Sequence, residues 1–231
     1  MRTRIITLLS FLLITSLFIF AQEDVTTFLG IPVDGTKSEM RQKLINKGFT
    51  PTKTKEFDFL EGEFNGSKVH VYIGTNNNKV YRIMLADENT LDEANIRIRF
   101  NNLVNQFERN SRYSSPIENQ RIPDNENISY EMNVHNKVYE AVFFQKPDDS
   151  KIDTVALKNN MLQAIYEKYS PDELENATED IKTDMMITSL KVMEELLRKK
   201  TVWFRIEKHY NEYYIAMFYD NVYNQANGED L

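Results

Sequence analysis

The hydrophobic and polar positions of the chain follow two different periods in different stretches. In four stretches the apolar side chains recur every three or four residues, which is the pattern of an amphipathic helix. The predicted helices cover residues 37–47, 91–109, 153–169 and 171–200. Thirty helical residues would span about 45 Å, so we expect a bend or break near the middle of the last one.

Three of these helix starts carry a capping box. In this motif a hydroxyl at the N-cap and a carboxylate three residues later satisfy free backbone N–H groups reciprocally. The pairs are Thr36 with Glu39, Thr90 with Glu93, and Ser170 with Glu173. Each box marks the residue at which we expect a helix to begin.

Between the helices the apolar residues alternate with polar ones, which is the period of a half-buried strand. A meander is predicted over 56–86, with one turn at Asn65-Gly66 and a second at Asn76–Asn78. Two-residue Asn-Gly turns are a strong signal for a β-hairpin. Two further hairpins are predicted, one joining 128–134 to 137–144 and the other joining 201–208 to 212–219.

A short pattern recurs at the start of three predicted returning strands. It reads NKVYRIM at 78–84, NKVYEAV at 136–142 and NEYYIAM at 211–217. The sequence therefore predicts an α+β fold, in which antiparallel sheets carry amphipathic helices on one face. A helix-then-hairpin unit would be loosely repeated three times, although chance similarity among strand-forming residues is the alternative.

The first 21 residues have the pattern of a signal peptide. Arg2 and Arg4 precede an apolar run that ends before the small residue Ala21, and this run is shorter than the roughly 20 residues of a membrane span. We expect export to the periplasm or the medium, with no membrane span after cleavage. An uncleaved N-terminal anchor is the alternative.

The remaining chain is expected to form one core or two. Residues 22–146 would form a first α+β region with two helix-and-hairpin units. Residues 147–220 would add a helical segment and a C-terminal hairpin, packed on the same core, and 221–231 would be a flexible tail.

Alternation along the three returning strands divides their side chains between two faces. The face expected to contact the helices carries Tyr81, Ile83, Leu85, Tyr139, Ala141, Phe143, Tyr214, Ala216 and Phe218. The opposite face is rich in apolar residues but carries charges, so we interpret it as a partner-binding surface or as a face covered by the 112–127 loop or by the last helix. A one-residue error of register, which would invert every assignment, is the third possibility. The residues of this face that would bind the partner are Arg82, Met84, Glu140, Val142, Tyr213, Ile215, Met217 and Tyr219.

Composition and charge narrow the classes of function. The formal net charge is −7, and an acidic protein is a poor partner for nucleic acid. The chain has no cysteine, which excludes a disulfide framework and a lipid-modified cysteine. His70, His135 and His209 lack the spacing of a metal site, and no nucleophile or phosphate-binding motif is present. We therefore predict a protein that is not an enzyme and has no metal and no cofactor.

The stretch FLGIPVDGTKSEMRQKLINKGF, residues 28–49, resembles a known opening. It is similar to the start of small exported modules grouped with the β-lactamase inhibitory protein, and of outer-membrane assembly lipoproteins of the SmpA/OmlA kind. The matching positions are Ile31, Gly35, Thr36, Met40, Leu44 and Gly48. The resemblance covers residues 28–86 and implies helices on a sheet whose free face holds another protein. The predicted signal peptide, which ends in Ala-Gln, and the Asn- and Lys-rich composition are also similar to those of exported proteins of Bacteroides-type gut bacteria.

Three functional hypotheses follow from these observations. The first is an exported, non-enzymatic protein that binds another macromolecule, such as an envelope protein, through the apolar sheet face. The second is a structural or maintenance protein of the envelope, with no free binding face. The third is a hydrolase that uses a carboxylate site without a recognisable motif.

Overall fold

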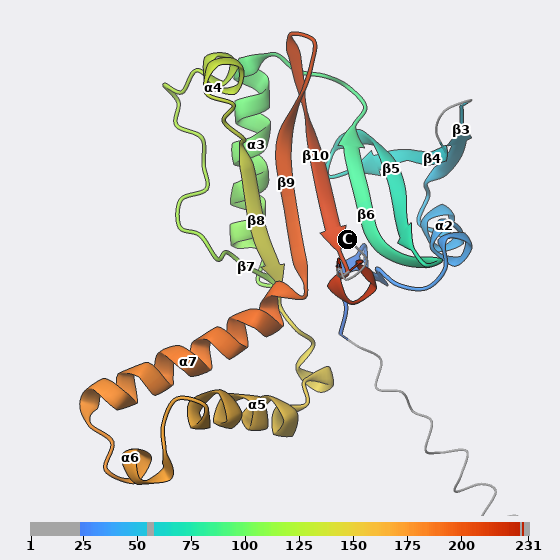
Figure 1. Cartoon of the computed structure of the whole chain (residues 1–231). Coiled ribbons are helices and arrows are strands. Elements are labelled where there is room, and N and C mark those ends of the chain that lie inside the picture. Colours follow the sequence, from blue (N-terminus) through green and yellow to red (C-terminus); the bar gives the residue numbers. More distant parts are fainter. Residues whose placement is uncertain (1–23, 55–57, 227, 229–231) are drawn as a thin grey trace, which may run out of the picture.

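The computed structural model of the chain describes residues 24–54, 58–226 and 228 (Figure 1). Within these residues, eight antiparallel strands form one sheet, and the short strands β1 (Thr27–Phe28) and β2 (Ile31–Pro32) form a separate hairpin. In spatial order the strands of the large sheet are β3 (Thr50–Lys53), β4 (Asp58–Phe64), β5 (Ser67–Asn76), β6 (Lys79–Asp87), β10 (Glu212–Asp220), β9 (Thr201–His209), β8 (Glu140–Gln145) and β7 (Tyr113–Ser114). The predicted α+β class with an antiparallel sheet is confirmed.

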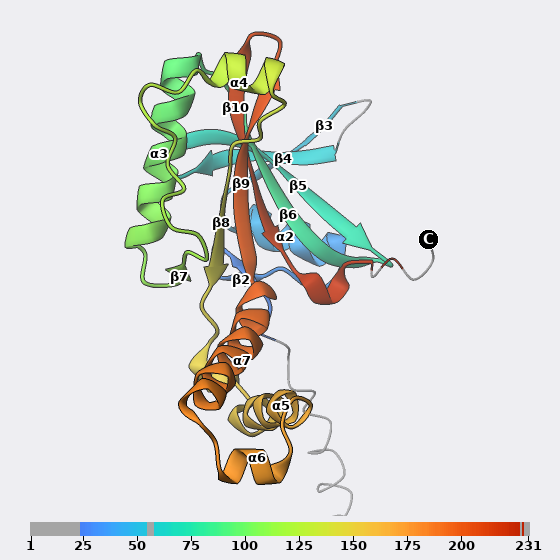
Figure 2. The same cartoon turned by 60° about the vertical axis from the view of Figure 1, so that its left-hand side comes forward.

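The helices fall into two groups. The helices α2 (Lys37–Asn46) and α3 (Glu93–Arg109), together with the short α4 (Ile128–Val134), contribute to the same hydrophobic core as the sheet. The other three, α5 (Thr154–Tyr166), α6 (Pro171–Glu175) and α7 (Glu179–Arg198), extend away from one end of the sheet (Figure 1). Figure 2 shows α3 on one side of β8, β9 and β10, and the other side of these strands faces away from the hydrophobic core to which α2, α3 and α4 contribute. We call that other side the open face.

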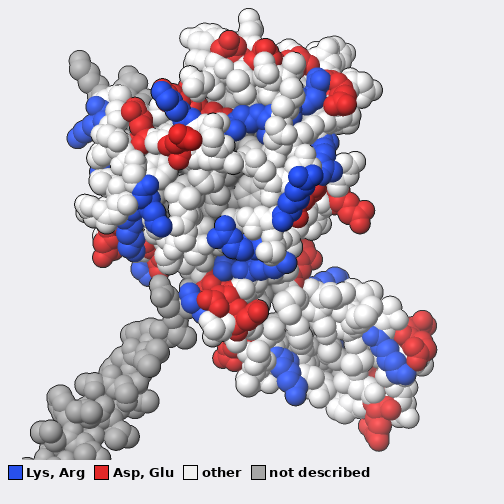
Figure 3. Space-filling view, turned by 180° about the vertical axis from the view of Figure 1, so that it is seen from behind, with Lys and Arg blue, Asp and Glu red and all other residues white. Residues whose placement is uncertain are grey.

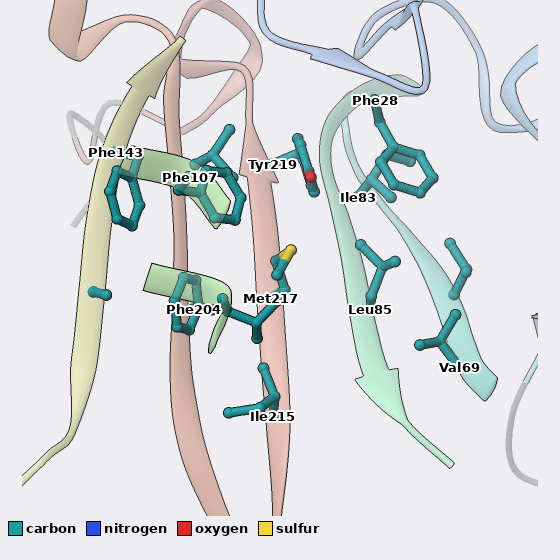
Figure 4. Packing of buried hydrophobic residues seen from close by; sticks show 14 of the residues in the cluster. Phe28, Val69, Ile83, Leu85, Phe107, Phe143, Phe204, Ile215, Met217 and Tyr219 are labelled. Atoms are coloured by element: carbon teal, nitrogen blue, oxygen red, sulfur yellow. The ribbon is translucent and has the colours of Figure 1, made fainter. Parts of the chain in front are cut away.

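The core lies between the sheet and α2, α3 and the β1–β2 hairpin. Figure 4 shows its rings and aliphatic chains, with Phe107 of α3 stacked on Phe143 of β8 at a centroid distance of 4.7 Å. Phe100, another α3 residue, meets Phe204 of β9 edge to face at 5.1 Å. Large aromatic surfaces removed from water in this way supply most of the stabilisation of a chain without disulfides.

Two of the three predicted capping boxes are confirmed. Both bonds of the box are present at Thr36 with Glu39 and at Ser170 with Glu173. The third is wrong, because the N-cap of α3 is Asp92, whose Oδ1 accepts a hydrogen bond of 2.8 Å from the backbone N–H of Asn95. The carboxylate of Glu93 instead accepts from the backbone N–H of Ile128 at 2.9 Å, which fixes the start of α4 against α3.

The segment 128–134, predicted as a strand, is the helix α4. Its apolar residues also fit a helical period, because Ile128 and Met132 are four residues apart and both pack on the core. The Asn127 side chain caps the helix by accepting from the N–H of Tyr130 at 2.8 Å. Without a strand at this position there is no second hairpin, and a helix-then-hairpin unit repeated three times is not confirmed.

The long helix predicted at 171–200 is interrupted, but not at its middle. It separates into α6 and α7 at residues 176–178, because Thr178 caps a new helix by accepting from the N–H of Ile181 at 3.4 Å. The turns at Asn65-Gly66 and at Asn77 and Asn78 have the positive φ angles that tight turns need.

The boundaries of the predicted regions also change. The hairpin β9–β10 lies in the middle of the large sheet beside β6, so both halves of the chain share one core. Part of the predicted flexible tail is held in place, since the buried Asn221 donates to the carbonyl of Val33 at 2.7 Å and Asn224 donates to Asp34 at 2.8 Å. The predicted signal peptide, 1–21, lies outside the described residues.

The helices α5, α6 and α7 form an arm, residues 147–198, inserted between the paired strands β8 and β9. Phe144 pairs with Thr201, and the N–H of Gln145 donates to the carbonyl of Lys200 at 2.9 Å. The two ends of the arm therefore leave the sheet side by side. Several large apolar side chains of the arm are exposed. These are Val155, Leu162, Tyr166, Met186, Ile187 and Leu190.

Replacing residues 147–198 by Asn-Gly is expected to leave the sheet folded. Continuing the β8–β9 register beyond Phe144 and Thr201 would bring Lys146 opposite Lys199, and a two-residue type I′ turn would fit this position. Urea denaturation followed by the fluorescence of Trp203 would measure the result, and we expect a change in unfolding free energy below about 1.5 kcal/mol. Loss of the cooperative transition would show that the sheet needs the arm.

Candidate functional site

The eight residues predicted to form one partner-binding surface divide between the two sides of the sheet. Arg82, Met84, Glu140 and Val142 lie on β6 and β8 with partly or fully exposed side chains. The four on β10 are buried in the core on the helix side, which makes the prediction of a common exposed face wrong for them. These are Tyr213, Ile215, Met217 and Tyr219, with exposed fractions of only 2–3%.

The register of β10 explains why the eight residues divide between the two faces. Met217 is paired with Leu85, and Phe218 is paired with Met84, and directly paired residues point to the same face of a sheet. Aligning the strands by their shared N-x-x-Y pattern shifts β10 by one residue, and a one-residue shift moves every side chain to the opposite face.

The same shift corrects the face predicted to contact the helices. Ile83, Leu85, Tyr139, Ala141 and Phe143 are buried in the core as predicted. Of the other four, Tyr81 is partly exposed, and Tyr214, Ala216 and Phe218 alternate with the core residues of β10 and so belong to the open face. Phe218 is buried there by its neighbours on the open face rather than by a helix.

One row of apolar side chains crosses the open face over five neighbouring strands. The strand register places its members directly beside one another. We call Tyr72, Met84, Phe218, Trp203 and Val142 the open-face row. The rings of Trp203 and Phe218 are stacked at a centroid distance of 4.0 Å, and Phe59 of β4 lies 5.6 Å from Tyr72. Apart from Phe218, each side chain of the row is partly exposed.

A neutralised ion pair borders this row. The Arg82 guanidinium donates to both carboxylate oxygens of Asp220, at 2.6 and 2.8 Å, and the indole N–H of Trp203 donates to the same carboxylate at 2.9 Å. The guanidinium also lies 5.0 Å from the centroid of the Phe218 ring. The hydrogen bonds that Arg82 donates to Asp220 raise the pKa of Arg82. The pair therefore holds the Trp203 ring in place without leaving a net charge beside it.

Two tyrosines give the open face hydroxyl groups. Burial raises the pKa of Tyr72 and of Tyr214, so both hydroxyls stay protonated at neutral pH and can donate hydrogen bonds. The loop expected to cover this face lies elsewhere. Ile122 is hydrogen-bonded to Asn101 of α3, and the Gln120 side chain pairs with the backbone of Val142 at the edge of β8.

The acidic and histidine side chains of the described residues are mostly paired. Among residues 24–54, 58–226 and 228, no three His, Asp or Glu side chains gather closely enough to hold a metal ion. Asp87 accepts two hydrogen bonds of 2.5 Å from Arg99. Hydrogen bonds lower the pKa of Glu126, Glu173 and Asp184. These acids are ionised at neutral pH, whereas a general acid needs a raised pKa.

The search for a membrane-spanning helix among the described residues finds none that is both long and apolar enough. Comparison with protein-family models, with curated proteins and with solved structures finds no match to this chain. The resemblance of residues 28–86 to the exported inhibitory modules therefore stays a prediction.

Sequence reasoning missed the most important members of the open-face row. Trp203 was assigned to a strand but to no face, and Phe218 was placed on the helix side. The signal that could have found Trp203 is the alternation along β9, in which Trp203, Arg205 and Glu207 alternate with the strictly apolar Val202, Phe204 and Ile206. This alternation already assigns Trp203 to the less buried face.

Proposed function

We propose that this chain is an exported, non-enzymatic protein that binds another protein through the open-face row. The observation that carries the proposal is the Trp203–Phe218 stack, which is fixed from its side by the Arg82–Asp220 pair. Rigid, partly exposed aromatic side chains supply contact area at a small loss of conformational entropy, and Trp, Tyr, Met and Arg are enriched in protein interfaces.

The partner's contact surface would be apolar at its centre. The open-face row offers indole, thioether and phenyl groups, while Asp220 already neutralises Arg82. Hydrogen-bond acceptors of the partner would meet the hydroxyls of Tyr72 and Tyr214 at the border of the contact. The resemblance of residues 28–86 to modules that hold another protein on a free sheet face supports the same proposal.

Site-specific photocrosslinking tests this proposal. A photoreactive phenylalanine analogue at Met84 is expected to crosslink to one main partner in the periplasm or medium of the native host. The same analogue at Lys43, exposed on α2, is the matched control and should not capture that partner. Adding Val142→Arg to the Met84 variant should reduce crosslinking about tenfold or more, because a charge is then desolvated at the interface.

Two crosslinking results would contradict the proposal. Crosslinks that are the same from Met84 and Lys43, or that persist with Val142→Arg in a folded protein, would show that the open-face row is not the contact. A structural role in the envelope, without a free binding face, would then be the better reading.

A further inference from the structure

A separate cavity of about 450 Å³ lies on the helix side of the sheet. Six elements that are distant in the sequence meet around it: the β1–β2 turn, the end of β4, the end of α3, and the strands β7, β8 and β10. Its volume falls within the range of about 300–1,000 Å³ that is typical of small-molecule sites. It shares no residue with the open-face row.

Aromatic rings form the inner wall of this cavity. The buried ring of Tyr219 lies 6.5 Å from Phe64, which meets it edge to face. Phe107 and Tyr113 form a second pair, in edge contact at a centroid distance of 4.8 Å. Both pairs line the cavity, so a ligand in it would contact aromatic side chains.

The polar groups of the cavity are mainly uncharged. Gln145 is only 6% exposed, and its Oε1 accepts from the backbone N–H of Thr27 at 2.7 Å while its Nε2 donates to the Tyr113 hydroxyl at 3.2 Å. This network fixes β1, β7 and β8 around the cavity. The side-chain amide of Asn65 donates to that of Gln106, and Asn110 is the fourth amide of the lining.

Amides and hydroxyls both donate and accept hydrogen bonds. They therefore match a ligand whose own groups do both, which is the property of sugar hydroxyls and not of carboxylates or phosphates. Because Asn65 and Gln106 are exposed and bonded to each other across the mouth, a ligand can replace their mutual bond without leaving a buried group unpaired.

The charges around the cavity do not favour an ion of either sign. Glu63 and Arg112 are the charged residues of the lining, one of each sign. The helix end at the cavity is the C-terminus of α3, where the helix dipole is negative and disfavours anions. In Figure 3, which views the molecule from behind, Lys and Arg are interspersed with Asp and Glu between wide uncharged areas.

We propose that this cavity binds a neutral saccharide ring. One apolar C–H face of the sugar would lie on the ring of Phe64, which is partly exposed, and its hydroxyls would bond to the amides of Gln106, Asn110 and Asn65. Leu29, which is 41% exposed at the β1–β2 turn, lines the cavity and would shield the ligand from water. The aromatic wall excludes a purely polar polyol as the preferred ligand, and the amides exclude a plain hydrocarbon.

Saturation-transfer NMR with a panel of neutral mono- and disaccharides tests this assignment, with the corresponding uronic acids and amino sugars as charged probes. The wild-type protein is expected to transfer saturation to ring protons of at least one neutral sugar. Gln106→Ala should weaken that binding about three- to tenfold, the loss expected for one hydrogen bond. Leu29→Trp, which adds bulk at the mouth, should abolish it.

Asn102→Ala is the matched control, because Asn102 is an exposed amide of α3 about one turn from Gln106 and does not line this cavity. It should bind like the wild type. Absence of transfer to every neutral sugar, tighter binding of the charged probes, or undiminished binding by Leu29→Trp would each overturn the assignment. If Leu29→Trp does not fold, as judged by its circular dichroism melt, the comparison of Gln106→Ala with Asn102→Ala still decides it.

Discussion

Met217→Asp is expected to unfold the protein. Met217 lies at the centre of the sheet with 3% of its surface exposed, between Leu85 of β6 and Phe204 of β9. A carboxylate at this position would be buried without a partner, or would have to stay protonated. The loss should exceed about 4 kcal/mol, which is comparable with the whole stability of many domains, about 5–15 kcal/mol.

Met84→Asp makes the same chemical change on the other side of the sheet and serves as the control. Met84 is partly exposed on the open face beside Phe218, so its new carboxylate would stay in contact with water. We expect a loss of about 1 kcal/mol or less, measured for both variants by urea denaturation. Similar losses for the two variants would show that the faces of β10 are assigned wrongly.

Asp220→Ala is expected to have the second largest effect. The side chain of Asp220 accepts three hydrogen bonds, two from Arg82 and one from Trp203. Removing one partner of a largely buried ion pair leaves the other charge and the indole N–H without acceptors. We expect a loss of about 3 kcal/mol, at the lower end for such pairs because Arg82 is partly exposed.

The change should also be visible in fluorescence. Trp203 is the only tryptophan, and the loss of its hydrogen bond should alter its emission before unfolding begins. Asp220→Asn keeps the shape and one acceptor, so it should fall between the wild type and Asp220→Ala. Glu194→Ala, which breaks the exposed pair with Arg198, should cost less than about 0.5 kcal/mol. An Asp220→Ala loss as small as that one would contradict the role given to the pair.

Much of the fold could be predicted because local periodicity determined it. The apolar stripes of α2 and α3 and the alternation in β5, β6, β9 and β10 correspond closely to observed elements. The failure at 128–134 has a different cause: Ile128 and Met132 fit both periods, and besides the Asn127 cap the helix is favoured by the bond from the Ile128 N–H to Glu93. That bond joins residues 35 apart, so no window of the sequence contains it.

The candidate site was harder to predict, because it depends on register. Met217 and Phe218 are both apolar, and β10 alone does not reveal which of them faces α3. The neighbours decide: Met84 beside Phe218 is partly exposed, and Leu85 beside Met217 is buried. Arg82 correctly indicated a solvent-exposed face, but its partner Asp220 lies 138 residues away, and only the folded chain brings Trp203 beside the pair.

The insertion of the arm between β8 and β9 has a consequence for the order of folding. Gln145 and Lys200 must meet before these strands can pair, and closing a loop of this length instead of a two-residue turn costs about 3 kcal/mol more in chain entropy. Helices form quickly, because their contacts are local. Early pairing of α5 with α7 would bring the two ends of the arm together and remove most of that entropy loss. The arm would then act as a template for the pairing of β8 with β9, so that the middle of the sheet is completed late.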